Sequence, residues 1–145
     1  MSDKKLVESL KKVLADSYVL YLKTQNYHWN VTGPNFNSLH TMFEMQYNDL
    51  FAAVDLIAER IRALGEKAPG TFAIYGKLTS IKEGDENKSA SQMVKELADD
   101  QKLIIKTLND ALDAANACGD DASADIMIGR LEVHQKNAWM LNSSL

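Results

Sequence analysis

Two histidines and a glutamate lie close together in the stretch 28–44, on either side of a predicted turn. His28 and His40 flank a Gly33-Pro34 break, and Glu44 follows His40 by four residues, about one turn of an α-helix. Because a glycine followed by a proline ends a helix, we expect the chain to reverse there and bring His28 beside His40. Imidazole and carboxylate groups at such a corner can bind a metal ion.

A second pair of acids, Asp55 and Glu59, lies further along the same predicted helix, again spaced by four residues. At about 100° per residue, His40, Glu44, Asp55 and Glu59 share a face that lies away from the main apolar stripe. Apolar side chains such as Phe51 lie between them on that face, which is not typical of a helix face in solvent. The pattern therefore predicts that something covers this face.

The axial separation of the two pairs decides how they can share a metal. The pairs are eleven to fifteen residues apart, or about 16–22 Å along a helix, whereas metal–ligand bonds are about 2 Å long. One chain therefore cannot close one site with both pairs. A second copy of the helix, antiparallel across a two-fold axis near Asp49-Leu50, would bring each His40/Glu44 pair opposite an Asp55/Glu59 pair and form two equivalent sites.

Each such site would hold two imidazoles, two or three carboxylates and at least one open position. Ligands of this kind, without a thiolate, suit a redox-active first-row metal such as iron, and zinc fits them as well. The alternative is that the acids face solvent and the histidines are core or capping residues. That alternative accounts for each residue singly, but five such residues at one phase and spacing favour the metal site.

The elements that must position these residues are four long helices, predicted at about 4–30, 35–64, 89–118 and 120–143 from their apolar periodicity. The third opens with Ser89-Ala-Ser-Gln92, a capping-box pattern, and the fourth opens with Asp120-Asp121, acids that suit a helix N-terminus. Residues 65–88 form a stretch too long for a plain loop, in which Phe72-Ala-Ile-Tyr75 predicts a short helix. We therefore predict an all-α fold, a ferritin-like four-helix bundle with one long crossover connection carrying a short helix, as a single domain over residues 1–145.

The composition excludes several classes of function. A net charge of -4 argues against a domain built mainly to bind nucleic acid. The only cysteine, Cys118, excludes an intrachain disulfide and a Cys-rich zinc site, and it fits a reducing compartment. The N-terminus lacks the apolar run of a signal peptide, and no run of about eighteen apolar residues occurs. We expect a cytoplasmic protein without membrane contact.

Two signatures carry a resemblance to a known family. His28-Trp29-Asn-Val31-Thr-Gly33, followed by Leu39-His40 and Glu44, resembles the first signature of the Dps family (DNA-binding protein from starved cells, the mini-ferritins). Val54-Asp55-Leu-Ile57-Ala58-Glu59-Arg60, followed by Leu64-Gly65 and Ala68, resembles the second. The resemblance covers the entire chain, including the crossover and the closing Trp139-Met140-Leu141.

The resemblance implies a hollow homo-dodecamer built from two-fold dimers, with ferroxidase sites at the dimer interfaces. His28, His40 and Glu44 of one subunit would meet Asp55 and Glu59 of the other. It implies oxidation of Fe(II), preferably by hydrogen peroxide, and storage of the ferric iron inside, which protects the cell from oxidative damage. Many members have Asp where this chain has Glu44, and the longer side chain bears on where the metal lies and on whether one or two irons bind.

Four further residues acquire expected roles through the resemblance. Trp29, next to the first ligand, either intercepts radical equivalents or simply packs. Family members admit iron through acidic pores on three-fold axes near the start of the last helix, where Asp120, Asp121 and Asp125 fall. Acids lining a pore concentrate cations, although helix capping is an alternative for Asp120 and Asp121.

The competing function is a nucleoid-coating, DNA-binding protein. Some family members coat DNA with flexible lysine-rich N-terminal tails. Here the available lysines fall mostly within the first predicted helix: Lys4, Lys5, Lys11 and Lys12. With a negative net charge as well, we expect DNA binding to be weak or absent.

The remaining histidine and the cysteine are expected to have no chemical role. His134 has no paired ligand at a useful spacing and is predicted to be structural or at the surface. Cys118 is predicted to be a packed small residue before the stop at Gly119. Glu-x-x-His pairs, which build a di-iron site within one subunit, are absent, and this favours the interface site over that of the larger ferritins.

Overall fold

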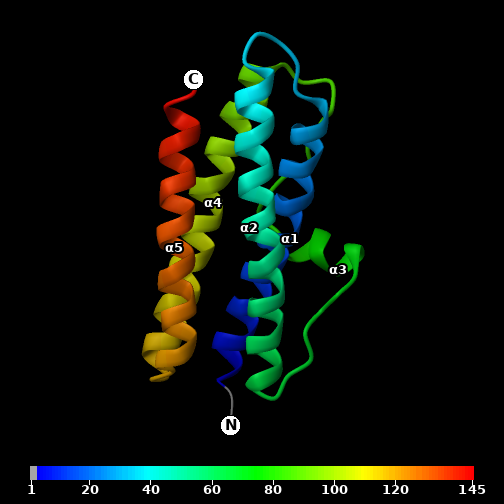
Figure 1. Ribbon diagram of the computed structural model, residues 1–145. Coiled ribbons are helices and arrows are strands. Elements are labelled where there is room, and N and C mark those ends of the chain that lie inside the picture. Colours follow the sequence, from blue (N-terminus) through cyan, green and yellow to red (C-terminus); the bar gives the residue numbers. More distant parts are fainter. Residues whose placement is uncertain (1–2) are drawn as a thin grey trace.

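The computed structural model describes residues 3–145, and within that range it contains five helices and no strand. Four long helices form the bundle: α1 (Lys4–Asn30), α2 (Phe36–Ala63), α4 (Ala90–Ala117) and α5 (Asp121–Asn142). The short α3 (Phe72–Leu78) lies beside the bundle, in the connection between α2 and α4 (Figure 1). The predicted all-α bundle with a long crossover and a short helix is confirmed. None of the helices within 3–145 has both the length and the apolar character needed to span a membrane.

The order of the helices explains the crossover. Figure 1 shows that α1 and α2 are antiparallel, as are α4 and α5, whereas α2 and α4 run in the same direction. The chain must therefore travel back along the whole bundle after α2, and it passes α3 on the way. A connection of this length is what the ferritin-like topology requires.

Side chains cap α4 and α5 where the sequence predicted them. Ser89 and Gln92 form the complete capping box at the start of α4, with each side chain accepting from the other's backbone N–H. Asp120 caps α5 by accepting from the backbone N–H of Ser123, and Asp3 caps α1. Each such cap stabilises a helix by about 1 kcal/mol, so the helix starts are fixed by local sequence.

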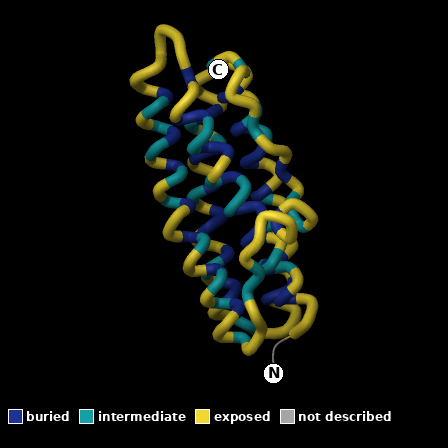
Figure 2. Tube along the Cα trace, turned by 90° about the vertical axis from the view of Figure 1, so that its right-hand side faces the viewer, coloured by how far each residue is buried: buried dark blue, intermediate teal, exposed yellow. Residues whose placement is uncertain are grey.

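The core lies along the inner faces of the four long helices, and the turns and crossover are mostly exposed (Figure 2). All but four of the apolar residues whose periodicity predicted the first three long helices are buried, and the exceptions lie half-buried at the edge of the core: Tyr21, Val54, Leu64 and Leu112. Burying one such aliphatic side chain stabilises the fold by about 1.5–3 kcal/mol. The apolar stripes thus determine how the helices pack.

A buried carboxylate attaches the crossover to the bundle. Asp16 of α1 is 1% exposed. It accepts hydrogen bonds from the hydroxyls of Thr79 (2.7 Å), Ser80 (2.9 Å) and Thr107 (2.7 Å), and from the backbone N–H of Ser80 (2.7 Å). Because buried polar groups are costly unless they are paired, these bonds fix the end of α3 against α1 and α4.

A second buried network lies nearer the turn between α1 and α2. The ammonium of Lys23 contacts the carbonyl oxygen of Lys82 (2.9 Å) and the carboxylates of Asp100 (2.8 Å) and Glu96 (3.3 Å). The Tyr27 hydroxyl donates to Glu96 (2.7 Å), and burial raises the pKa of this phenol. These contacts hold the last third of α1 against α4, and so they fix the part of α1 that carries His28.

Candidate metal site

A five-residue turn joins α1 to α2 and carries the predicted glycine break. Gly33 has a φ of 116°, a conformation that side chains with a Cβ rarely adopt. The backbone N–H of Val31 donates to the carbonyl of Tyr27, and that of Phe36 donates to the carbonyl of Gly33. The reversal is therefore tight, and it brings the end of α1 beside the start of α2.

The turn places His28 and His40 ring against ring. Their ring centroids are 3.7 Å apart, with an angle of 11° between the planes. The Nδ1 atom of each histidine lies 2.7 Å from the backbone carbonyl oxygen of the other. A carbonyl oxygen can only accept, so each Nδ1 must carry a proton and donate it. In the neutral imidazoles the two Nε2 lone pairs are then available as ligands.

Neighbouring aromatic rings hold this pair in place. Phe36 stacks on His40 with centroids 4.9 Å apart, and Tyr47 meets His28 edge-on at 5.1 Å. His28 is 6% exposed and His40 is half-buried. Rings oriented by hydrogen bonds at Nδ1 and by packing are typical of metal-binding histidines.

In the single chain none of the three acids, Glu44, Asp55 and Glu59, forms a metal-binding group with the two histidines. Glu44 is half-buried one turn beyond His40, whereas Asp55 and Glu59 are exposed and further along α2. No three His, Cys, Asp or Glu side chains within residues 3–145 are grouped so that they could hold a metal ion. The structure therefore brings the two histidines together. Within one subunit, Asp55 and Glu59 remain separated from them.

The face of α2 that was predicted to be covered is open in the single chain. Phe51 is 61% exposed on this face. Asp55 lines a surface hollow of about 670 Å³ together with Phe51, Ala58 and two tyrosines of α1, Tyr18 and Tyr21. Sequence reasoning counted Tyr21 only as part of the apolar series of the first helix and did not consider Tyr18, although their spacing of three residues places both on one face of α1.

The three aspartates predicted near a pore differ in their surroundings. Asp120 accepts from Ser123 and binds the guanidinium of Arg60 at 3.0 Å. Partial burial alone would raise the pKa of Asp120, but the hydrogen bonds from Ser123 and the charge of Arg60 lower it. Asp121 and Asp125 are exposed. Only these two present carboxylates that are open to solvent.

His134 is structural, which confirms one of its two predicted roles. It is fully buried, its Nδ1–H donates to Gln101 Oε1 (2.8 Å), and Arg130 Nη2 donates to its Nε2 (3.0 Å). The same Nη2 also donates to Asp49 (2.8 Å). Burial, with a further contribution from the charge of Arg130, lowers the pKa of His134 to about 3. The imidazole therefore stays neutral and has no free nitrogen.

Two other residues lie on the surface. The prediction that Cys118 is packed is wrong: the residue is exposed, because α4 ends at Ala117 and Cys118 belongs to the turn at the end of the bundle. Trp29 is 61% exposed. It belongs to none of the aromatic ring pairs formed among residues 3–145. In the single chain its indole ring therefore stacks neither on another aromatic ring nor on the histidine pair.

Comparison with known proteins assigns the chain to a family. Residues 7–145 match the family of ferritin-like domains. DNA protection during starvation protein 2 of Bacillus anthracis is 35% identical over 143 residues, which cover 99% of this chain and 98% of that protein.

Solved structures agree with this match. Dps from Staphylococcus aureus superposes with a TM-score of 0.95 at 40% identity, covering 100% of this chain and 98% of that one. A Dps protein from Vibrio cholerae O1, described as a member of a broad superfamily of ferritin-like diiron-carboxylate proteins, superposes with a TM-score of 0.92 at 33% identity, covering 97% and 88%. The chain therefore belongs to the ferritin-like family and, within it, to the Dps proteins, as its two signatures indicated.

Proposed function

We propose that this protein is a ferroxidase that oxidises Fe(II), with hydrogen peroxide as the preferred oxidant, and stores the ferric product inside a hollow homo-dodecamer built from two-fold dimers. The observation that carries the proposal is the reciprocal hydrogen bonding of His28 and His40, which leaves both Nε2 atoms available as ligands, with Glu44 one helical turn beyond His40. A histidine pair of this kind needs further oxygen ligands to complete an iron site, and α2 carries Asp55 and Glu59 at 15 and 19 residues beyond His40.

In this proposal the substrate Fe(II) binds between two subunits. His28, His40 and Glu44 of one chain bind it together with Asp55 and Glu59 of the other. The anionic carboxylates favour Fe(III) over Fe(II) and so lower the barrier to electron loss. The backbone carbonyls that accept from both Nδ1 atoms keep the rings oriented and increase their basicity. An open position at the metal admits the peroxide.

Other parts of the chain would serve the same activity. Asp121 and Asp125, whose carboxylates are exposed, would line an entry pore and concentrate Fe(II). Asp120 would contribute less charge there because Arg60 pairs with it. Trp29, adjacent to His28 and exposed in one chain, would lie next to the site and intercept radical equivalents. The single thiol fits a cytoplasmic location.

DNA protection, which the name of the Bacillus anthracis relative describes, would here follow from the removal of iron and peroxide. Coating of DNA has little support, because Lys4, Lys5, Lys11 and Lys12 all belong to α1 and the net charge is -4. A rigid helix with four lysines supplies few phosphate contacts, and such contacts provide most of the affinity for DNA.

The sharpest test of the shared site uses two defective variants, His28→Ala and Asp55→Ala. In an assembly made from either variant alone, every proposed site lacks one ligand, and we expect oxidation of Fe(II) by peroxide to be slow in both. When the two variants are unfolded and reassembled together at equal amounts, dimers that contain one chain of each kind have one intact site. About a quarter of the wild-type activity should then return.

A site contained within one chain would give a different result, because mixing would restore nothing. Absence of activity in the mixture, while reassembled wild-type protein is active, would therefore contradict the shared site. The matched control mixes His28→Ala with His40→Ala. In that mixture both residues belong to the same half-site, so a mixed dimer has one defect in each of its two sites and no activity should return.

A further inference from the structure

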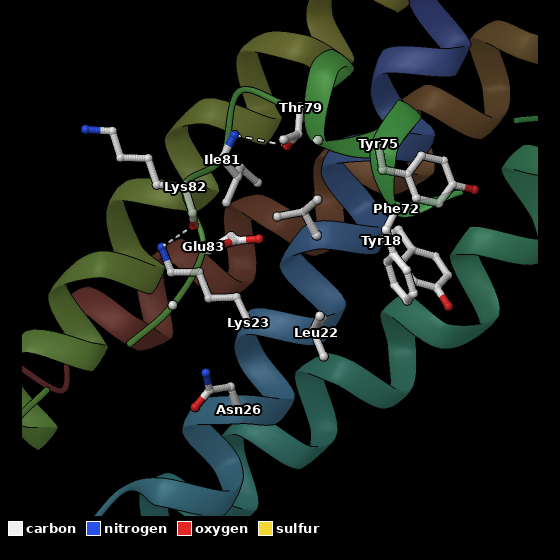
Figure 3. A pocket seen from close by; sticks show the side chains of 13 residues that line it. Tyr18, Leu22, Lys23, Asn26, Phe72, Tyr75, Thr79, Ile81, Lys82 and Glu83 are labelled. Carbon is white, nitrogen blue, oxygen red and sulfur yellow. Dashed lines mark hydrogen bonds between the residues drawn. The ribbon is translucent and has the colours of Figure 1, made fainter. Parts of the chain in front are cut away.

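A chain of aromatic rings leads away from the histidine pair. His28 contacts Tyr47 with centroids 5.1 Å apart, Tyr47 contacts Tyr21 at 5.9 Å, and Tyr21 contacts Tyr18 at 5.9 Å. Tyr18 then contacts Tyr75 at 5.1 Å, and Figure 3 shows these last two rings side by side. Separations of this size are those of rings in contact, so the chain is continuous from α2 across α1 to α3.

The end of this row of rings that is further from His28 lies near Asp55, which belongs to the other half of a proposed metal site. Tyr18 and Tyr21 line the same surface hollow as Asp55. Under the proposed function, one subunit contributes His28 to one iron site and Asp55 to the other. The tyrosines of each subunit therefore extend from one site of a dimer toward the other.

Peroxide chemistry at such a site has an electron shortage. Reduction of hydrogen peroxide to two waters takes two electrons, and a site that holds a single Fe(II) supplies only one. If no second electron arrives, the O–O bond breaks to give hydroxide and a hydroxyl radical. A tyrosine phenol can supply an electron, provided that its proton can leave at the same time.

We propose that Tyr47, Tyr21 and Tyr18 form a redox chain that delivers this second electron to the peroxide, a role that rests on the proposed ferroxidase function. In the first step, Fe(II), one tyrosine, hydrogen peroxide and one proton give Fe(III), a tyrosyl radical and two waters. In the second step, Fe(II) at the other site and one proton reduce the radical, giving Fe(III) and the tyrosine again. The sum consumes two Fe(II), one peroxide and two protons, and no hydroxyl radical is released.

The surroundings of the tyrosines are consistent with electron transfer through Tyr47, Tyr21 and Tyr18. Tyr18, Tyr21 and Tyr47 are half-buried in the single chain, and Tyr18 and Tyr21 share a hollow with Asp55, whose carboxylate can take up a phenol proton. Tyr75 is buried, its hydroxyl donates to the carbonyl of Pro69 (2.6 Å), and burial raises the pKa of its phenol, which makes it the end of the chain. The fifth tyrosine, Tyr27, belongs to none of the ring pairs formed among residues 3–145, and its hydroxyl donates to Glu96.

The experiment mixes the assembled protein with Fe(II), at less than one iron per site, and hydrogen peroxide, followed by rapid freezing and electron paramagnetic resonance. Wild-type protein should show a tyrosyl radical that disappears when more Fe(II) is added. Tyr21→Phe breaks the chain in its middle and Tyr47→Phe breaks it at the histidines. Both should lose most of the radical and release more hydroxyl radical, detected with a spin trap. Tyr27→Phe, which removes a phenol outside the ring chain, is the matched control, and its yield of tyrosyl radical per Fe(II) oxidised should equal that of wild type.

Three outcomes would overturn the redox chain. Wild-type protein that forms ferric iron with peroxide but never a tyrosyl radical would contradict it, while the ferroxidase function would stand. Equal loss of the radical in Tyr27→Phe and Tyr21→Phe would also contradict it, as would an unchanged yield of hydroxyl radical in both Tyr21→Phe and Tyr47→Phe. Failure of wild-type protein to oxidise Fe(II) at all would instead reject the proposed function, and the redox chain with it.

Discussion

His28 and His40 at the turn between α1 and α2 differ from His134 of α5 in how their ring nitrogens are used. In the first pair, each Nδ1 donates to a backbone carbonyl, and each Nε2 has no hydrogen-bond partner among residues 3–145 of the single chain. In His134 both nitrogens are paired, one with Gln101 and the other with Arg130. One region thus orients imidazoles for an external ligand, and the other uses an imidazole to join helices.

The difference shows that burial alone does not separate a ligand from a core histidine. His28 is 6% exposed and His134 is 0% exposed, so both count as buried. What separates them is the number of nitrogens already satisfied. A histidine with one committed and one free nitrogen can bind a metal without losing its orientation, whereas His134 would have to break a buried hydrogen bond first.

The largest expected effect separates the two regions by activity. His40→Ala removes a proposed ligand, and we expect the rate of Fe(II) oxidation by peroxide to fall about 10–100-fold or more. His134→Gln should leave the rate per folded protein unchanged. The measurement follows the absorbance of the ferric product after mixing with Fe(II) and peroxide. Similar losses in the two variants would break the distinction between a ligand and a structural histidine.

The second prediction concerns stability against pH. The pKa of His134 is about 3 in the folded chain, against an ordinary value of 6.5, so between these values the unfolded chain takes up a proton that the folded chain refuses. This group's contribution to stability is therefore complete above pH 6.5 and is lost as the pH falls toward 3.

Denaturant unfolding of wild type and His134→Gln, at about pH 7.5 and pH 5, checks this contribution. The variant should be less stable by about 1–3 kcal/mol at the higher pH, since one amide cannot satisfy both former partners. The gap between the two proteins should narrow at the lower pH. A constant gap would mean that His134 is not held neutral by the fold.

The smallest effect concerns the turn that makes the histidine pair. Gly33→Ala forces a Cβ onto a residue with a φ of 116°, which should destabilise the protein by about 1–2 kcal/mol and slow Fe(II) oxidation modestly. Gly70→Ala is the control, because a Cβ there meets no atom within 4 Å and φ is not positive in this way. Equal midpoints of unfolding for the two variants would show that the turn does not depend on the glycine.

Much of the fold could be predicted because its causes are local. Ser89 and Gln92 are three residues apart, so their capping box can be recognised from the sequence. The period of the apolar residues in each helix likewise defines its buried face. The convergence of His28 and His40 also followed from local signals, a glycine and a proline between two helices. The separation of the Asp55/Glu59 pair from the histidines followed from helix rise alone.

The tertiary structure decided what depends on residues far apart in the chain. The bonds of His134 to Gln101, of Asp120 to Arg60 and of Asp16 to the crossover join different elements, and no spacing rule foretells them. The same holds for the contact of Tyr21 with Tyr47. Side-chain periodicity tells which face of a helix is buried, but only the packing of helices decides which side chains meet there. The sequence by itself therefore determined where two halves of a candidate metal site lie, and the fold decided how the histidine half is oriented and which tyrosines lie beside it.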